Sequence, residues 1–239
     1  MAKKKPEKKI ISTEDILLKL CHSVTSVLTE ATHHQVNYSS MAQRISKTCL
    51  RPDIGCFVLF DGAFSGLVVI NFTAEAAMEV YSNYLLNMGI SENELAQVYT
   101  SDEVGNVMGE LMNQILGDFT KKVSQELQSS ITQSQPKMLT LNRQVRISVD
   151  TDLVKPQSRR VSFYTEKNNI FYMELSMDYT EFIKLCDFDS PEEIDPDSLI
   201  EKVNSGDTDN LSAVETSSQD ESESDDQEDQ DALLASLGL

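Results

Sequence analysis

The feature that most constrains this chain is an amphipathic segment at residues 101–119, with the sequence SDEVGNVMGELMNQILGDF. At about 100° per residue, its apolar side chains gather on one side of a helix. On another side lies a polar stripe with spacings of 3, 4 and 3 residues, made of Glu103, Asn106, Glu110 and Asn113. A helix that is apolar on one side must bury that side against another layer, so the segment predicts a layered domain.

The polar stripe differs from an ordinary solvated helix face. Such a face usually carries Lys and Glu four residues apart, but here no Lys or Arg precedes Lys121. The same helix contains Gly105, Gly109 and Gly117, and each glycine costs about 1 kcal/mol relative to alanine. We expect a helix that keeps three glycines to let another molecule approach its backbone. A solvated face with incidental glycines is the alternative.

Composition limits the class of ligand and the compartment. The net charge is −19, and residues 203–239 carry eleven Asp and Glu with no Lys or Arg. Because phosphate binding needs clustered cations, this balance argues against nucleic acid as the main ligand. The charged start has no following apolar region, and no apolar stretch reaches ~18 residues, so we expect neither a signal peptide nor a membrane span.

The cysteines and histidines favour reduced thiols in a cytoplasmic protein. Four cysteines are scattered without CxxC spacing, which is not the pattern of a disulfide framework or a zinc site. Three histidines do not complete a metal site with them, so no metal is expected. The chain also has no P-loop, no GxGxxG and no Ser-His-Asp arrangement.

Local signals predict an α+β domain with helices packed on a mostly antiparallel sheet. Ser12 to Asp15 resembles a capping box that opens a helix ending near His33, and Thr73 can cap a second helix over 74–88. The stripe helix is expected to run from residue 101 or 102 to about 128. A hairpin is predicted at 54–60 and 67–72, and further strands at 137–141, 144–149, 159–166 and 170–177.

Other parts of the chain give weaker or different signals. Residues 35–52 are expected to be irregular or to hold a short helix, and residues 178–186 to form a short closing helix. The expected organisation is a basic disordered N-terminus at 1–11, a domain at 12–186, an acidic disordered linker at 187–230 and a terminal peptide at 231–239. That peptide carries an acid and an apolar edge, made of Asp231, Leu233, Leu234 and Leu237, which is typical of a segment that folds on a partner. Docking of the peptide on its own domain is the alternative.

The stripe and its surroundings resemble the CheC/CheX/FliY phosphatases of bacterial chemotaxis. Their active helix has Asp or Ser, three residues, Glu, two residues and Asn, with a proline after 22 more. Here Glu110 and Asn113 match the pair, and 22 residues separate Asn113 from Pro136. Gly109, Gly117 and the preceding hairpin and helix also match, over about residues 12–180. The first motif position is Asn106 in place of Asp or Ser.

The resemblance implies a protein-aspartate phosphatase that acts on a phosphorylated, CheY-like receiver domain. Glu110 and Asn113 would be the catalytic residues. Asn113 would orient the attacking water, and Glu110 would pair with a lysine of the receiver. No cofactor of its own is implied, since the receiver holds Mg²⁺. The first helix has no ExxN motif, which implies a single site, as in CheX; Glu103 and Asn106 as a displaced second pair is the alternative.

The terminal peptide carries a second resemblance. DQDALLASLGL looks like the C-terminal peptide by which CheZ holds CheY, and like the N-terminal segment of FliM that binds the same surface. A different class of function also stays open, namely a CheX-like binding module or adaptor for receiver or flagellar-switch proteins, without catalysis. Relatives like CheX dimerise through sheet edges, so the resemblance is compatible with a homodimer, although no edge strand in this sequence is diagnostic of one.

Overall fold

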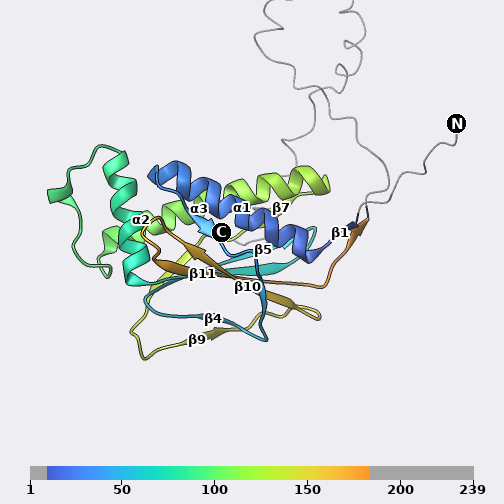
Figure 1. Ribbon diagram of the computed structural model, residues 1–239. Coiled ribbons are helices and arrows are strands. Elements are labelled where there is room, and N and C mark those ends of the chain that lie inside the picture. Colours follow the sequence, from blue (N-terminus) through green and yellow to red (C-terminus); the bar gives the residue numbers. More distant parts are fainter. Residues whose placement is uncertain (1–9, 184–239) are drawn as a thin grey trace, which may run out of the picture. The chain divides into compact units, whose positions relative to one another are not determined.

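The computed structural model describes residues 10–183 (Figure 1). The predicted linker at 187–230 and the terminal peptide with Asp231, Leu233, Leu234 and Leu237 lie outside the described residues, as does most of the predicted N-terminal segment. Within the described part, no helix is both long enough and apolar enough to cross a membrane.

The predicted helices form, and their ends follow the predicted capping residues. Helix α1 (Thr13–Thr32) starts at a complete capping box between Ser12 and Asp15 and ends at His33 in the left-handed conformation. Helix α2 (Ala74–Asn87) begins after Thr73, whose hydroxyl accepts the Ala76 N–H. A short 3-10 turn, η1 (Glu92–Glu94), leads to α3 (Asp102–Leu127), which contains the polar stripe.

An eight-stranded antiparallel sheet forms the other main layer. Its central order is β2-β10-β11-β6-β5-β7, with β3 also beside β10 and β8 beside β5. The strands are β2 (Asn37–Tyr38), β3 (Gln43–Arg44), β5 (Ile54–Gly62), β6 (Gly66–Phe72), β7 (Ile131–Gln133), β8 (Lys137–Thr140), β10 (Gln157–Tyr164) and β11 (Ile170–Met177). Two small sheets pair β1 (Ile10–Ile11) with β12 (Phe182–Ile183), and β4 (Thr48–Leu50) with β9 (Ile147–Val149).

The helices cover one face of the sheet, and the β4–β9 pair lies against the other (Figure 1). The main core fills the space between helices and sheet, and a smaller apolar cluster of Leu50, Leu67, Val69 and Leu141 lies beneath the β4–β9 pair. The predicted α+β class, with helices on a mostly antiparallel sheet, is therefore confirmed. Alternation of side chains in β5 and β11 explains the arrangement, since successive residues point to opposite faces.

Two parts of the chain differ from the prediction. Residues 35–52 are mostly irregular, which was one of the two expectations, but they contain the three short strands β2, β3 and β4 and no helix. The predicted closing helix at 178–186 is replaced, in its described part, by β12, where Phe182 pairs with Ile11 and Ile183 with Ile10. These strands are only two or three residues long, so partner strands far away in sequence determine them and local sequence does not.

Candidate functional site

Helix α3 presents the polar stripe because its apolar side is fixed in the core. Ser101 caps the helix, and its hydroxyl accepts the Val104 N–H at 3.3 Å. Burial on one side then leaves the side chains of Asn106, Glu110 and Asn113 exposed on the other. The buried residues of the helix are Val104, Met108, Leu111, Met112, Ile115, Leu116, Phe119 and Val123.

An open groove of about 830 Å³ runs between the N-terminal half of α3 and strand β8. From the helix it is lined by Asp102, Gly105, Asn106, Gly109, Glu110 and Asn113, together with Thr100 and Ser101 just before it. From the sheet side it is lined by Ile54, Gln135, Pro136, Met138 and Thr140. Most of these side chains are polar, while buried Ile54 and half-buried Met138 supply apolar surface.

The structure brings most of the predicted site residues into this one groove. Asn106, Glu110 and Asn113 enter it from α3, and Gly109 contributes its backbone. Pro136 lies across from them, directly before the first residue of β8. This position suits a residue without an N–H, because it precedes the strand hydrogen bonds. Gly117 is exposed further along α3 and does not line the groove.

Glu103 is separated from the rest of the predicted stripe. Its carboxylate accepts a hydrogen bond of 2.5 Å from the hydroxyl of Tyr81 on α2, and Tyr81 in turn accepts the Ala96 N–H at 2.9 Å. Burial and the hydrogen bond to Glu103 raise the pKa of Tyr81. Glu103 does not line the groove. It therefore joins α2, the η1 connection and α3, which is a structural task.

The two predicted catalytic side chains differ in their surroundings. Glu110 accepts a hydrogen bond of 3.2 Å from the side-chain amide of Gln114, one turn further along the helix. The amide of Asn113 has no hydrogen-bond partner among residues 10–183. A free amide can both donate to and accept from water without adding charge. The groove thus holds a carboxylate that can bind a cation and, one turn away, an amide that can orient a water molecule.

The glycines open the floor of the groove on the helix side. A Cβ atom built on Gly105 would meet nothing within 4 Å, and one on Gly109 would meet only the Met138 side chain, at 3.6 Å. Neither glycine is thus required by packing within this chain. Side chains at these positions would instead project into the groove, so the two glycines leave the α3 backbone accessible there.

Asp102, Gln135, Thr100 and Thr140 also line the groove and were not predicted from the sequence. Asp102 could have been found, because it lies four residues before Asn106 and therefore on the same helix face. However, the helix dipole also favours an acid in the first turn of a helix, so Asp102 can be explained there without a binding role. Gln135 and Thr140 reach the groove only through pairing of β8 with β5, and no local pattern indicates that pairing.

The remaining titratable groups give no sign of a second centre in the described part of the chain. Within residues 10–183, no cluster of three His, Cys, Asp or Glu side chains could hold a metal ion. Cys21, Cys49 and Cys56 are free thiols, and burial raises the pKa of Cys21 and of Cys56 to about 12. Such thiols are protonated and unreactive at neutral pH, so they act as core residues.

A protein-family model matches almost the whole chain. The family described as "Protein of unknown function (DUF3334)" matches residues 7–239 of this chain. No curated protein matches the sequence.

Solved structures of chemotaxis proteins share the fold. CheX from Desulfovibrio desulfuricans has a TM-score of 0.56 and 19% identity, covering 69% of this chain and 99% of that chain. A putative chemotaxis protein from Desulfovibrio vulgaris Hildenborough has a TM-score of 0.58 and 15% identity, covering 70% of this chain and 99% of that chain. The CheX–CheY–BeF₃–Mg²⁺ complex from Borrelia burgdorferi has a TM-score of 0.53 and 15% identity, covering 69% of this chain and 98% of that chain. The expected likeness to CheX is therefore confirmed at the level of the fold.

Proposed function

This chain belongs to the DUF3334 family, and we propose that it is a phosphatase for the phosphorylated aspartate of a CheY-like receiver domain. One observation carries the proposal: a single open groove contains Glu110 and Asn113 from α3 together with Pro136. The CheX-like fold supports it, and one structure of that fold is a CheX protein in complex with CheY.

The chemistry requires little covalent participation from the protein. Phosphoryl transfer passes through a loose transition state with the attacking and leaving oxygens in line, so catalysis consists mostly of positioning. Asn113 orients a water molecule toward the phosphorus, with its amide as donor or acceptor. An amide suits this position better than a carboxylate, because it adds no negative charge beside the phosphoryl group.

Glu110 has a different task in this proposal. Its exposed carboxylate pairs with the lysine of the receiver's phosphorylation pocket and thereby fixes the register of α3 on the partner. The Mg²⁺ needed for the reaction belongs to the receiver. Asn106 lines the same groove one turn before Glu110, so an uncharged amide stands at the motif position of Asp or Ser; relative to Asp, it adds no negative charge to the contact surface.

Phosphate release from phosphorylated receiver domains of the same cell tests the proposal. Wild-type protein should accelerate the loss of phosphate, and Asn113→Ala should reduce the acceleration by about 100-fold, because a misplaced water loses most of the positional advantage. Gln125→Ala is the matched control, since Gln125 is an exposed amide on the same helix outside the groove. Equal activity of wild type and Asn113→Ala would contradict the proposal.

The same experiment separates the enzyme from a binding module. If wild-type protein binds phosphorylated receivers without accelerating phosphate loss, the groove serves an adaptor that acts on receiver or flagellar-switch proteins. Asn106, which departs from the phosphatase pattern, favours this second function.

A further inference from the structure

A second hollow continues the groove toward the connection between β8 and β9. It has a volume of about 410 Å³ and is lined by Tyr99, Thr100, Thr140, Leu141, Asn142 and Arg143. Thr100 and Thr140 line both hollows, so the two form one continuous surface. The proposed reaction uses only the first hollow, which leaves the second without a task.

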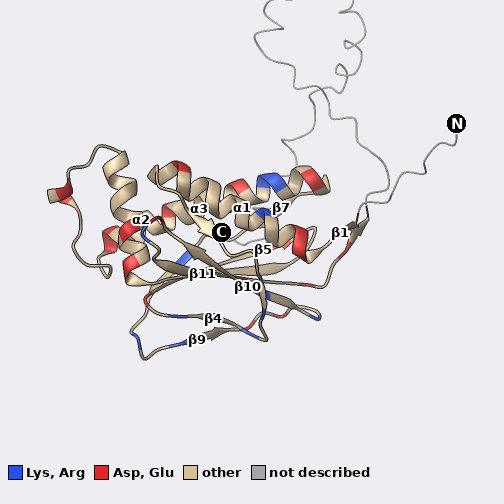
Figure 2. Cartoon of the chain, viewed as in Figure 1, with Lys and Arg blue, Asp and Glu red and all other residues tan. Residues whose placement is uncertain are grey.

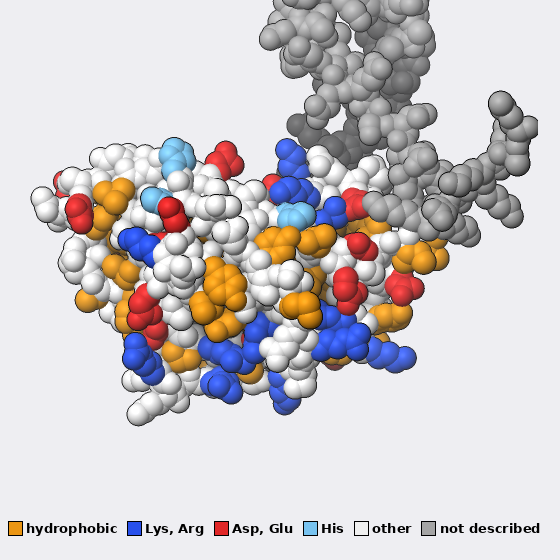
Figure 3. Space-filling view, in the orientation of Figure 1, with side chains coloured by type: hydrophobic (Ala, Val, Ile, Leu, Met, Phe, Trp, Pro, Cys, Tyr) orange, Lys and Arg blue, Asp and Glu red, His pale blue; other side chains and the backbone are white. Residues whose placement is uncertain are grey.

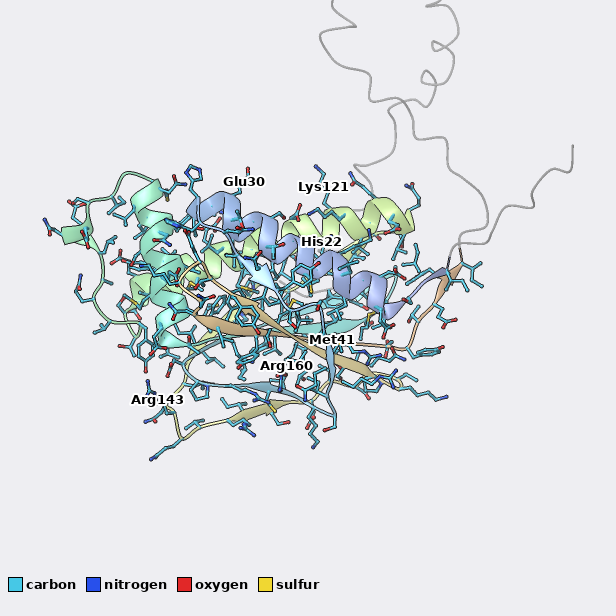
Figure 4. All side chains as sticks on the ribbon, in the orientation of Figure 1. His22, Glu30, Met41, Lys121, Arg143 and Arg160 are labelled. Carbon is cyan, nitrogen blue, oxygen red and sulfur yellow. The ribbon has the colours of Figure 1, made fainter. Side chains whose placement is uncertain are left out.

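The chain holds Arg143 at the tip of a well-defined turn. The carbonyl of Asn142 accepts the Val145 N–H at 2.8 Å, and its side-chain oxygen accepts the Gln144 N–H at 3.3 Å. Just before the turn, the Leu141 N–H donates to the carbonyl of Asp53 at 2.8 Å and ties the connection to the start of β5. Figure 4 shows Arg143 at the outer edge of the strand layer, away from the helices.

The guanidinium of Arg143 is available to a partner. Its side chain is 78% exposed, and the nearest carboxylate is Asp53, whose oxygen lies 3.7 Å from Nε. This is an ion pair without a hydrogen bond, since among the described residues the buried Oδ1 atom of Asp53 has no hydrogen-bond partner. Its planar set of donors matches a carboxylate in two-point geometry.

The charge distribution of the domain places Arg143 on its cationic side. Residues 41–51 and 137–160 carry nine Lys and Arg but only two Asp and Glu. The other described residues carry four Lys and Arg and eighteen Asp and Glu. Lys and Arg accordingly gather below the sheet, while Asp and Glu concentrate on the helices (Figures 2 and 3). A partner that covers both hollows therefore meets acids at Asp102 and Glu110 and a cation at Arg143.

We propose that Arg143 contributes to partner specificity by binding a carboxylate on the receiver surface, beside the phosphorylation pocket. This inference rests on the proposed function, since the receiver must lie in the groove. The bound group is a carboxylate and not the phosphoryl group, because Asn113 lines only the first hollow and Arg143 only the second. Arg143 is thus a specificity-determining residue, and it does not take part in the chemical step.

The test is a titration of the full chain with CheY-type receiver domains of the same cell, loaded with Mg²⁺ and beryllofluoride or left unmodified. Arg143→Glu should raise the dissociation constant by about tenfold or more in both receiver states. Arg146→Glu is the matched control: Arg146 is exposed three residues further on and lines neither hollow. It should change the constant by less than about twofold at 0.15 M salt, where distant charges are screened.

Further variants make the result specific. Arg143→Gln should weaken binding less than Arg143→Glu, and Arg143→Lys should recover part of the affinity, with thermal unfolding showing that each variant is folded. Equal losses of receiver affinity for Arg143→Glu and Arg146→Glu would overturn the inference, because the net charge of this side of the domain would then explain both losses. A loss confined to the beryllofluoride-loaded receiver would also overturn it, because it would indicate a contact with the phosphoryl group.

The inference and the proposed function can fail separately. If wild-type protein accelerates phosphate loss and Arg143→Glu binds the receiver as tightly as wild type, the inference about Arg143 is rejected and the proposed phosphatase function is retained. Binding that depends on Arg143 without accelerated phosphate loss would remove the phosphatase and leave Arg143 as a contact of a binding module.

Discussion

Glu110 and Asn113 lie one turn apart in the same groove, and the different tasks proposed for them can be separated by kinetics. Glu110→Gln keeps the shape of the side chain and removes its charge. We expect the apparent affinity for the receiver to fall by about tenfold, because the ion pair with the partner lysine is lost. The maximal rate should fall much less. Rates of phosphate loss over a range of receiver concentrations measure both quantities. Glu92→Gln is the control for a general loss of negative charge, since Glu92 is exposed outside the groove.

The glycines of α3 offer a second prediction at the scale of single residues. Gly105→Ala and Gly109→Ala should each stabilise the protein by about 1 kcal/mol, since alanine favours the helix and neither Cβ atom meets a close neighbour. Both should weaken receiver binding, because the new methyl groups project into the groove. Gly117→Ala should stabilise the helix equally and leave binding unchanged, as Gly117 lies outside the groove. Thermal unfolding and titration test this prediction, and wild-type binding by Gly109→Ala would contradict it.

Elements with strong local signals could be predicted from the sequence. Helices α1 and α2 were predicted with their capping residues Ser12 and Thr73, and α3 was predicted with a start at residue 101 or 102, because caps and apolar periodicity act within a few residues. The β5–β6 hairpin was predicted from two β-rich runs around a turn. Strand β7 was missed, since the polar run around it has no strand pattern and pairs with β5 only in the folded domain. The same holds for the groove: most of its residues on α3 were predicted, whereas most of its residues on the β8 side were not.

A buried carboxylate on β11 is hydrogen-bonded to strand β4 of the β4–β9 pair. Glu174 is fully buried, and its side chain accepts the Cys49 N–H at 2.9 Å and two hydrogen bonds from Arg160, at 2.9 and 2.7 Å. We expect Glu174→Ala to reduce the free energy of unfolding by about 3–5 kcal/mol, because it leaves the Arg160 charge without its partner in a partly buried site. Denaturant unfolding measures the loss. Hydrogen exchange at Cys49 should rise locally, and an unchanged exchange rate would show that the β4–β9 pair is held by other contacts.

At the scale of the whole molecule, charge and groove together define how a partner must approach. Within residues 10–183, the acids lie mainly on the helix layer and the cations mainly on the strand layer (Figure 2). The groove lies between α3 and β8, where these two regions meet. A receiver that binds there therefore needs a cation opposite Glu110 and an anion opposite Arg143. A pair of contacts with opposite charges fixes the orientation of the partner more strictly than a single charged contact, because a rotated partner would place like charges against each other.

The predicted terminal peptide would add an effect that depends on chain length. A flexible linker of about 43 residues, as predicted for 187–229, would have a root-mean-square span near 36 Å at ~5.5 Å × √n, so a receiver held by residues 231–239 would stay near the groove at sub-millimolar to millimolar effective concentration. Deleting residues 231–239 should raise the receiver concentration needed for half-maximal phosphate loss by about tenfold or more, while the rate at saturation changes little. A tail of the same length and composition with a scrambled order of Asp231, Leu233, Leu234 and Leu237 is the control, and it should behave like the deletion. An unchanged half-maximal concentration in the deletion variant would remove the tether and assign all partner binding to the groove.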